Sequence, residues 1–243
     1  MPVISIRTEY ALHAVVPAAG TGSRMNSDTP KQFIGVNGST ILTHTIKRLL
    51  QIELLESIVV VLDEASYNAG QLKFDNPKIT ICIGGDSRAE SVRNGLLHLG
   101  SVAPATMALV HDAARPCVRV EEVLRLIADV DGSENGGLLG MPVVDTIKRA
   151  DANLHVTETV DRSQLWRAAT PQLFRCTELL SALSRALEEG TSVTDEASAM
   201  QYAGYSPKLV ECSADNIKIT TATDLALAEH YLACQQAEQK IAH

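Results

Sequence analysis

Short apolar runs alternate with amphipathic stretches along the first 142 residues, and this alternation restricts the possible fold more than any other feature. The amphipathic stretches repeat apolar residues at helical spacing, as at Val123, Leu124 and Ile127. Strands that alternate with helices in this way favour a mostly parallel twisted sheet with helices on both faces, the Rossmann-like α/β class. The apolar runs predict strands over Ala14–Pro17, Ser57–Leu62, Ile79–Ile83, Met107–His111 and Gly137–Pro142.

Capping and stop residues indicate where the helices begin and end. Ser39 is expected to cap a helix that carries Ile41 and Leu42 on its apolar face. Ser87 and Glu90 have the spacing of a capping box, which predicts a helix that starts after Ser87. Beyond residue 170, we predict helices over Thr177–Glu189 and Asp195–Ala203, a strand over Lys208–Cys212 and a last helix from Thr223.

The periodicity changes at residues 143–169, where short β-rich pieces with polar alternation replace the longer runs. An isolated ribbon of two strands is only marginally stable in water, so we expect this one to pack against something. A second subunit is the simplest candidate. We therefore expect a single domain over residues 1–243 with an inserted β-arm, residues 143–169, that mediates a homodimer.

The composition limits the compartment and the partners. The formal net charge is −8 and no block of Lys or Arg occurs, which argues against nucleic acid and anionic membranes as partners. We see neither an apolar run of about 20 residues nor a signal-peptide pattern. The five cysteines show no C-x-x-C and no metal-ligand spacing, as is typical of reduced thiols. A cytoplasmic protein is expected.

A loop after the first predicted strand carries the most specific functional signal. Small residues over Ala18–Ser23 let backbone N–H groups approach an anion without obstruction from side chains. Arg24 and Lys31 add two positive charges nearby. Gly22 is followed by Ser-Arg rather than by the Lys-Ser/Thr of a P-loop, and Met25 stands where a dinucleotide fingerprint needs a small residue. The combination suits a nucleoside triphosphate.

Several further motifs follow in a fixed order over roughly residues 12–232. They are Pro17-Ala-Ala-Gly-Thr-Gly-Ser-Arg-Met25, Pro30-Lys-Gln32, Gly84-Gly-Asp-Ser-Arg88, His111-Asp-Ala-Ala-Arg-Pro116, Asp145-Thr-Ile-Lys148, Thr159-Val-Asp-Arg162, Thr170-Pro-Gln172, Thr194-Asp-Glu-Ala-Ser198 and Asp215-Asn-Ile-Lys218. Together they resemble the sugar-phosphate nucleotidylyltransferases, and among these the cytidylyltransferases of methylerythritol phosphate. The resemblance implies transfer of CMP from CTP to 2-C-methyl-D-erythritol 4-phosphate, with release of pyrophosphate, in non-mevalonate isoprenoid biosynthesis.

Two alternatives remain at this point. A different polyol phosphate, such as ribitol 5-phosphate, is the alternative acceptor on the same scaffold. A regulatory nucleotide-binding module without catalysis is an alternative of another class. Such a module would be expected to lack Arg24, Lys31 or Asp112, and all three are present.

The implied reaction needs charge neutralisation more than proton transfer. A phosphate monoester is already an anionic nucleophile, since its second pKa is about 6. No general base is required, and catalysis rests on positioning and on stabilising the charge of the transferred phosphoryl group. The resemblance implies four catalytic cations, which are Arg24, Lys31, Arg162 and Lys218. Of these, Arg24 and Lys31 would stabilise the transition state.

The resemblance also implies where CTP binds. Gly85, Asp86 and Ser91 follow a predicted strand and would meet the cytosine, although a plain capped turn fits their spacing equally well. The full set of CTP-binding candidates is Pro17, Ala18, Ala19, Gly20, Gly22, Gly85, Asp86, Ser91 and Asp112.

Carboxylates after two strands suggest a metal, and a second group of residues suggests the acceptor pocket. Asp112 could hold Mg²⁺ or another divalent cation together with the substrate phosphates, and Asp215 could be a second ligand or a local cap. Two candidates for binding the acceptor, Thr146 and Arg162, lie on or beside the arm, so we expect a site shared across the dimer. The resemblance implies that the acceptor is bound by Arg115, Thr146, Arg162, Thr170 and Lys218.

Overall fold

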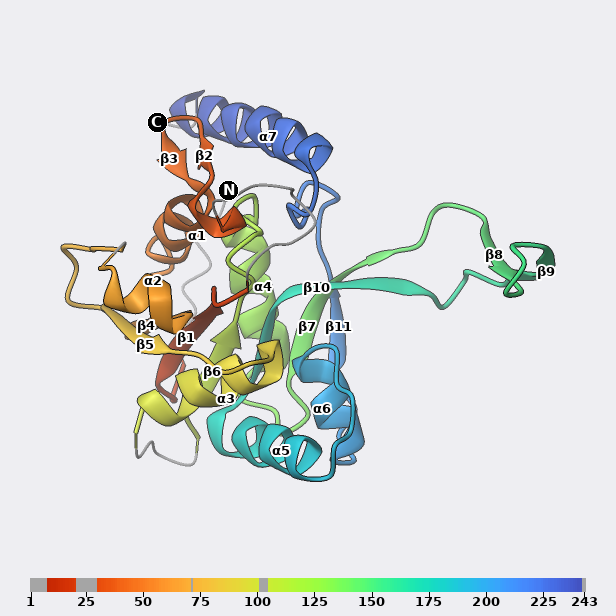
Figure 1. Ribbon diagram of the computed structural model, residues 1–243, viewed down its shortest axis with the longest axis horizontal. Coiled ribbons are helices and arrows are strands. Elements are labelled where there is room, and N and C mark those ends of the chain that lie inside the picture. Colours follow the sequence, from red (N-terminus) through yellow and green to blue (C-terminus); the bar gives the residue numbers. More distant parts are fainter. Residues whose placement is uncertain (1–7, 21–29, 71, 101–104, 242–243) are drawn as a thin grey trace.

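A seven-stranded sheet forms the centre of the computed structural model, which describes residues 8–20, 30–70, 72–100 and 105–241 (Figure 1). The strand order is β11-β7-β10-β6-β1-β4-β5, and the neighbours are parallel except where β10 pairs antiparallel with β6 and β7. The strands are β1 (Leu12–Pro17), β4 (Ser57–Leu62), β5 (Ile79–Ile83), β6 (Met107–Val110), β7 (Gly137–Pro142), β10 (Trp166–Arg175) and β11 (Lys208–Glu211).

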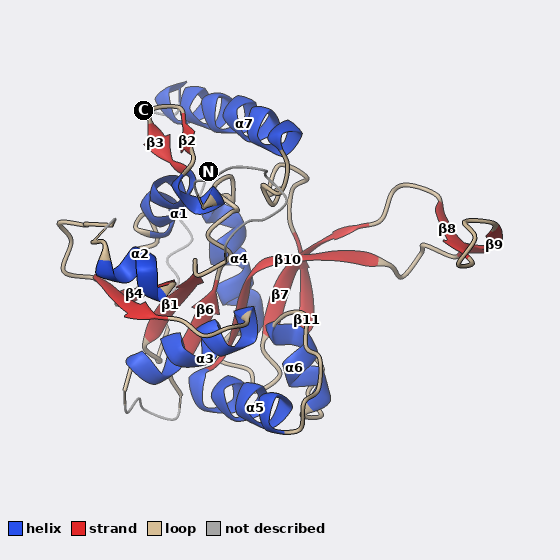
Figure 2. Cartoon of the chain, in the orientation of Figure 1, coloured by secondary structure: helices blue, strands red, loops and turns tan. Residues whose placement is uncertain are grey.

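Helices cover both faces of this sheet (Figure 2). Successive residues of a strand point to opposite faces, so Val16 packs in one core cluster with α1 and α4, and Val15 packs in the other with α3, α5 and α6. The predicted fold class is therefore confirmed. The helices are α1 (Ile41–Leu49), α2 (Glu64–Asn68), α3 (Arg88–His98), α4 (Val120–Val130), α5 (Cys176–Glu188), α6 (Glu196–Tyr202) and α7 (Ala222–Ile241).

Several predicted elements agree closely with the structure and one cap does not. The strands β4, β5 and β7 have the expected bounds, α4 carries Val123 and Ile127 on its buried face, and the capping box of Ser87 and Glu90 is present. The cap of α1, however, is Thr40, whose side-chain oxygen accepts from the backbone of Thr43. Ser39 instead pairs with Val36 in a short hairpin of β2 (Gly35–Val36) and β3 (Ser39–Thr40), so the prediction that Ser39 caps this helix was wrong.

The strand β10 is absent from the elements predicted from the sequence. This strand begins at the end of the expected arm and then runs through the middle of the central sheet. Its register shifts between Ala168 and Gln172, and Pro171 together with polar neighbours interrupts any apolar run. The strand is nevertheless buried from Ala169 to Phe174 because sheet neighbours lie on both sides.

The remaining part of the arm is a two-stranded ribbon that projects away from the body (Figure 1). It consists of β8 (Ile147–Ala150) and β9 (Val156–Val160), paired antiparallel. Apolar side chains on and near it are exposed, among them Leu154 at 85%. The structure thus has the ribbon that the sequence predicted, and a second subunit as its packing partner stays a prediction.

Two expectations from composition can be compared with the structure. All five cysteines are free thiols, and burial raises the pKa of Cys117 and Cys176 to about 12. Neither of these two thiols is therefore a ready nucleophile at neutral pH. Within the described ranges, none of the helices combines the length and the apolar character needed to span a bilayer.

Two glycines with the same backbone conformation offer a test of the packing. Gly136 and Gly190 have φ angles of +63° and +66°. A Cβ on Gly136 would lie 2.1 Å from the Phe174 ring and 2.5 Å from the Leu173 carbonyl oxygen, whereas a Cβ on Gly190 meets nothing within 4 Å. We expect Gly190→Ala to cost about 1 kcal/mol of unfolding free energy. Gly136→Ala should cost on the order of 3 kcal/mol or more, since overpacking adds to the backbone strain.

Urea unfolding of the two variants and the wild-type protein measures the difference. Because the left-handed backbone strain is common to both positions, Gly190→Ala is the matched control. Equal losses at the two positions would contradict the tight packing of Gly136 against β10.

Candidate active site

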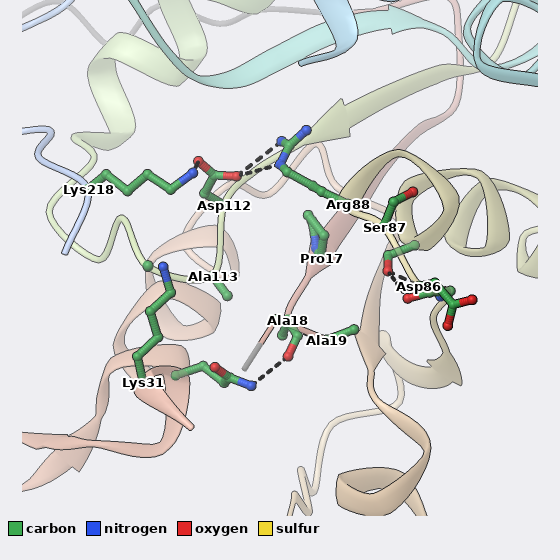
Figure 3. Close-up of a pocket in the computed structure, with 15 residues that line it drawn as sticks. Pro17, Ala18, Ala19, Lys31, Asp86, Ser87, Arg88, Asp112, Ala113 and Lys218 are labelled. Atoms are coloured by element: carbon green, nitrogen blue, oxygen red, sulfur yellow. Dashed lines mark hydrogen bonds and ion pairs between the residues drawn. The ribbon is translucent and has the colours of Figure 1, made fainter. Parts of the chain in front are cut away.

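A pocket lies where β1, β5 and β6 end, at the carboxyl edge of the sheet. In open α/β sheets this edge is the usual place for a ligand. We call it the loop pocket, and Figure 3 shows its residues. It is lined by Pro17, Ala18, Ala19, Gly20, Lys31, Gln32, Gly85, Asp86, Ser87, Arg88, Ser91, Asp112, Ala113, Ala114 and Lys218.

The structure brings the predicted CTP-binding residues together in this pocket, so far as it describes them. Eight of the nine candidates line it, namely Pro17, Ala18, Ala19, Gly20, Gly85, Asp86, Ser91 and Asp112. Lys31 and Lys218, predicted as catalytic cations, line it as well. Gly22 and Arg24 lie outside the described residues.

One wall of the loop pocket is a tight turn held by the first turn of α3. Glu90 Oε2 accepts from the backbone N–H of Asp86 at 2.9 Å, and Ser91 Oγ accepts from the backbone N–H of Gly85 at 3.2 Å. A Cβ on Gly85 would lie 2.4 Å from that of Glu90, so glycine is required there. The turn is therefore capped and also faces the pocket, and contact of its residues with the cytosine stays a prediction.

The opposite wall is held by a buried amide. Gln32 Nε2 donates to the backbone oxygen of Ala18 at 2.7 Å (Figure 3). Gln32 belongs to a 3-10 helix, Lys31–Phe33, which places Lys31 beside the end of β1. Because Gln32 is 2% exposed, this contact fixes the position from which Lys31 extends.

A second pocket adjoins the first and shares Arg88, Asp112 and Lys218 with it. We call it the adjoining pocket. Three predicted acceptor residues, Arg115, Thr170 and Lys218, line it, whereas Thr146 and Arg162 do not and are exposed on the arm. Its lining is completed by Ala168, Ala169, Gln172, Thr194 and Asp195.

Asp112 occupies the junction of the two pockets, where it meets three cations. Its Oδ1 lies 3.0 Å from Arg88, and its Oδ2 lies 2.9 Å from Lys218 Nζ and 3.5 Å from Arg115 Nε. Burial alone would raise the pKa of this carboxyl, but the charges of Arg88, Lys218 and Arg115 outweigh burial and hold the pKa well below its usual range. The carboxylate is therefore ionised at neutral pH.

The neighbouring His111 is a neutral structural group. Its Nε2 lies 3.0 Å from the Arg115 carbonyl oxygen, which can only accept, so Nε2 carries the proton. Its Nδ1 then accepts from the Thr170 hydroxyl at 3.0 Å, and that hydroxyl accepts from the backbone N–H of Asp112 at 3.0 Å. Burial lowers the pKa of His111 to about 4. His111 thus fixes Thr170 and, through it, the backbone of Asp112.

The two carboxylates predicted as metal ligands are not arranged as a metal site. Both oxygens of Asp112 already face cations, and Asp215 pairs with Arg119 at 2.8 Å and accepts from Gln235 at 3.0 Å. Asp215 lines neither pocket. Its partners Arg119 and Gln235 belong to the start of α4 and to α7. Among the described residues, no group of three His, Cys, Asp or Glu side chains could hold a metal ion.

Two residues at this site, Arg88 and Glu196, had no role predicted from the sequence. Arg88 donates to both carboxylate oxygens of Glu196, at 2.6 Å and 3.1 Å, in addition to its contact with Asp112. Both residues stand within the quoted motifs, Gly84–Arg88 and Thr194–Ser198. A cation directly after a small-residue turn was the available signal for Arg88, whereas nothing in the local pattern pointed to Glu196.

Fold and site together define an α/β nucleotide-binding protein with two connected pockets, whose shared cations suit two phosphorylated ligands. The model of the 2-C-methyl-D-erythritol 4-phosphate cytidylyltransferase family matches residues 12–234, and the chain belongs to that family. A protein of this name from Mannheimia succiniciproducens is 49% identical over 220 residues, covering 90% of this chain and 95% of the relative. One from Vibrio parahaemolyticus is 46% identical, covering 90% of this chain and 94% of the relative.

Solved structures agree with this assignment. The crystal structure of the Francisella tularensis protein of the same name matches with a TM-score of 0.80 and 35% identity, over 90% of this chain and 99% of that one. Another, titled 4-diphosphocytidyl-2C-methyl-D-erythritol synthase, matches with a TM-score of 0.79 and 35% identity, over 92% of this chain and 100% of that one. The resemblance inferred from the sequence motifs is confirmed.

The buried neutral His111 predicts how stability depends on pH. Its folded-state pKa of about 4 lies below the ordinary value of 6.5, so the unfolded chain binds the proton first as the pH falls. The contribution of His111 to the free energy of unfolding is fully present above pH 6.5. On the order of 3 kcal/mol is lost as the pH falls from 6.5 to about 4. Asp112, with its lowered pKa, loses its contribution only at more acidic pH.

Urea unfolding at a series of pH values, for the wild-type protein and His111→Gln, measures this contribution. The variant should show a smaller decrease in unfolding free energy over that window, whatever its stability at pH 7. Parallel curves for the two proteins would contradict a neutral buried His111.

Proposed function

We propose that this protein transfers CMP from CTP to 2-C-methyl-D-erythritol 4-phosphate, giving 4-diphosphocytidyl-2-C-methyl-D-erythritol and pyrophosphate in isoprenoid precursor biosynthesis. The observation that carries the proposal is the pair of connected pockets that share Arg88, Asp112 and Lys218. Relatives that span nearly the whole chain bear the name of this activity, which favours methylerythritol phosphate over ribitol 5-phosphate as acceptor.

The two substrates would occupy the two pockets. CTP would lie in the loop pocket, with its triphosphate along the small residues after β1 and its base near Gly85 and Asp86. The acceptor phosphate would lie in the adjoining pocket, near Arg115 and Lys218. A bond then forms between an acceptor phosphate oxygen and the α-phosphorus of CTP, while the bond from that phosphorus to the β-phosphate oxygen breaks and pyrophosphate leaves.

The side chains would supply charge and position in this reaction. Lys31, and Arg24 from the sequence, would stabilise the negative charge that spreads over the α-phosphate and the leaving group. Lys218 would hold the acceptor phosphate as a point charge, and Arg115 lies beside it. Neutral His111 needs no part in proton transfer, since the nucleophile is already an anion.

We propose that a divalent cation such as Mg²⁺ enters as part of the CTP complex. The cation partners of Asp112 and the distant pairing of Asp215 argue against a resident site built from these two carboxylates. Mg²⁺ commonly keeps several waters and binds through substrate phosphates. In that arrangement the metal would neutralise part of the triphosphate charge.

We also propose a homodimer in which each arm completes the partner's site, in the cytoplasm. Exposed apolar side chains on and beside the ribbon, such as Val144, Leu154 and Val156, would be covered by a second copy. Thr146 and Arg162 lie on the arm and away from both pockets of their own chain. Five free thiols are typical of a reducing compartment.

Pyrophosphate release measures the proposed activity directly. We expect rapid release with CTP, Mg²⁺ and 2-C-methyl-D-erythritol 4-phosphate, and little with ribitol 5-phosphate in a parallel assay. Release only with ribitol 5-phosphate would keep the reaction type and change the acceptor. Release with neither acceptor would overturn the proposed function.

Mixed dimers test the shared site. Lys218→Ala should chiefly raise the KM for the acceptor. Arg162→Ala should lower activity, because each Arg162 is proposed to contribute to the site of the other subunit. If each site combines Lys218 of one subunit with Arg162 of the other, co-refolded mixtures of the two variants regain about one quarter of the wild-type sites. A mixture no more active than the separate variants would contradict the shared site.

A further inference from the structure

Arg88 lies at the junction of the two pockets, since it lines both of them. It is the first residue of α3, where the capping box of Ser87 and Glu90 fixes the backbone. Its Nε donates to Asp112 Oδ1 at 3.0 Å, and its two terminal nitrogens donate to the carboxylate of Glu196. Figure 3 shows the side chain reaching across to Asp112. The guanidinium is therefore held along two edges by two carboxylates.

Glu196 has no role in the mechanism above. It is 0% exposed, begins α6 and lines neither pocket. A buried carboxylate without a charged partner costs several kcal/mol, and the fork of Arg88 supplies that partner. Because apolar residues often replace such buried pairs without loss of stability, stability alone gives no reason for a charge here. The position of Arg88 does give one.

The start of α6 is itself anchored to the central sheet. Gln172 of β10 accepts from the backbone N–H of Ala197 at 2.8 Å and donates to Asp195 Oδ2 at 2.9 Å. Gln172 and Asp195 line the adjoining pocket, so the anchor lies beside the proposed acceptor site. Glu196 is thus a fixed point against which Arg88 is held.

The orientation of Asp112 depends on this contact. With Oδ1 engaged by Arg88, Lys218 and Arg115 both lie at Oδ2. If Arg88 turned away, the carboxylate could rotate and Lys218, at 2.9 Å from Oδ2, would follow it. A displacement of about 1 Å at a reacting group can cost on the order of 100-fold in rate.

We propose that Glu196 is a positioning residue, which acts through Arg88 to hold Asp112 and Lys218 where the acceptor phosphate binds; the inference rests on the proposed function. Glu196 does not touch either substrate in this arrangement. It ties Arg88, one of the three side chains that both pockets share, to the buried start of α6.

Glu196→Gln tests the proposal, since it keeps the shape and removes the charge. Glu122→Gln is the matched control, because Glu122 is also buried, lines neither pocket and binds the backbone N–H of Ser213 with an oxygen that glutamine retains. For Glu196→Gln we expect kcat/KM for the acceptor to fall on the order of 10- to 100-fold at saturating CTP. The Kd of CTP should change by less than about threefold, or about 0.7 kcal/mol.

Calorimetric counting of CTP sites separates positioning from folding. A structural role would lower the number of CTP sites in parallel with turnover, whereas a positioning role leaves that number unchanged. Arg88→Lys keeps the charge and loses the fork, so it should reproduce the defect of Glu196→Gln even if the latter folds poorly.

Three outcomes overturn the inference. Wild-type kcat/KM in Glu196→Gln or in Arg88→Lys would show that the fork does not position the site. A loss of turnover that follows the loss of CTP sites would leave Glu196 a structural role only. A wild-type protein that turns over neither acceptor overturns the proposed function and this inference with it, and the wild-type assay alone distinguishes that case.

Discussion

The contact of the Asp112 carboxylate with three cations is the interaction on which the site depends. Arg88 comes from the start of α3, Arg115 from the turn after β6, and Lys218 from the segment between β11 and α7. Three parts of the chain that are distant in sequence therefore meet at one buried group. Because both pockets contain Asp112, this contact also fixes how the two pockets lie relative to each other.

The antiparallel strand β10 connects the arm to this site. It begins at Trp166, shortly after the ribbon ends at Val160, and reaches the adjoining pocket at Thr170 and Gln172 within a few residues. Thr170 holds the backbone of Asp112, and Gln172 holds the start of α6. Any force on the arm from a second subunit would therefore act on a strand whose middle lies in the site. The proposed dimer and the proposed chemistry share one element.

The sequence predicted those parts of the structure that local patterns determine. Strands buried on both faces read as apolar runs, which is why β4 and β7 were found with the right bounds. The edge strand β5 is only partly buried, but its isoleucines still form an apolar run with the right bounds. Residues that follow the strands gather at one edge of the sheet, as Gly85 and Asp112 do. The strand β10 was missed because Pro171 and its polar neighbours hide a strand that tertiary contacts bury.

Contacts between distant residues were beyond the reach of local patterns. Asp215 pairs with Arg119, and Arg88 with Glu196, across 96 and 108 positions of the chain. The spacing of residues around Asp215 or Arg88 does not indicate which residue forms the ion pair. The sequence therefore placed Asp215 near a metal because of its residue type, and the structure places it against α4 and α7.

Attraction between opposite charges explains why a site for anionic ligands contains carboxylates. Two unit charges 4 Å apart repel or attract by about 4 kcal/mol at an effective dielectric constant of 20. Arg88, Arg115 and Lys218 each lie within 3.5 Å of Asp112, and their attraction to its carboxylate offsets the repulsion among them. The lining of the adjoining pocket carries three cations, Arg88, Arg115 and Lys218, and two carboxylates, Asp112 and Asp195, which leaves a net charge of +1. The cations are thus held in place before any phosphate arrives, and the positive charge that remains is what attracts it.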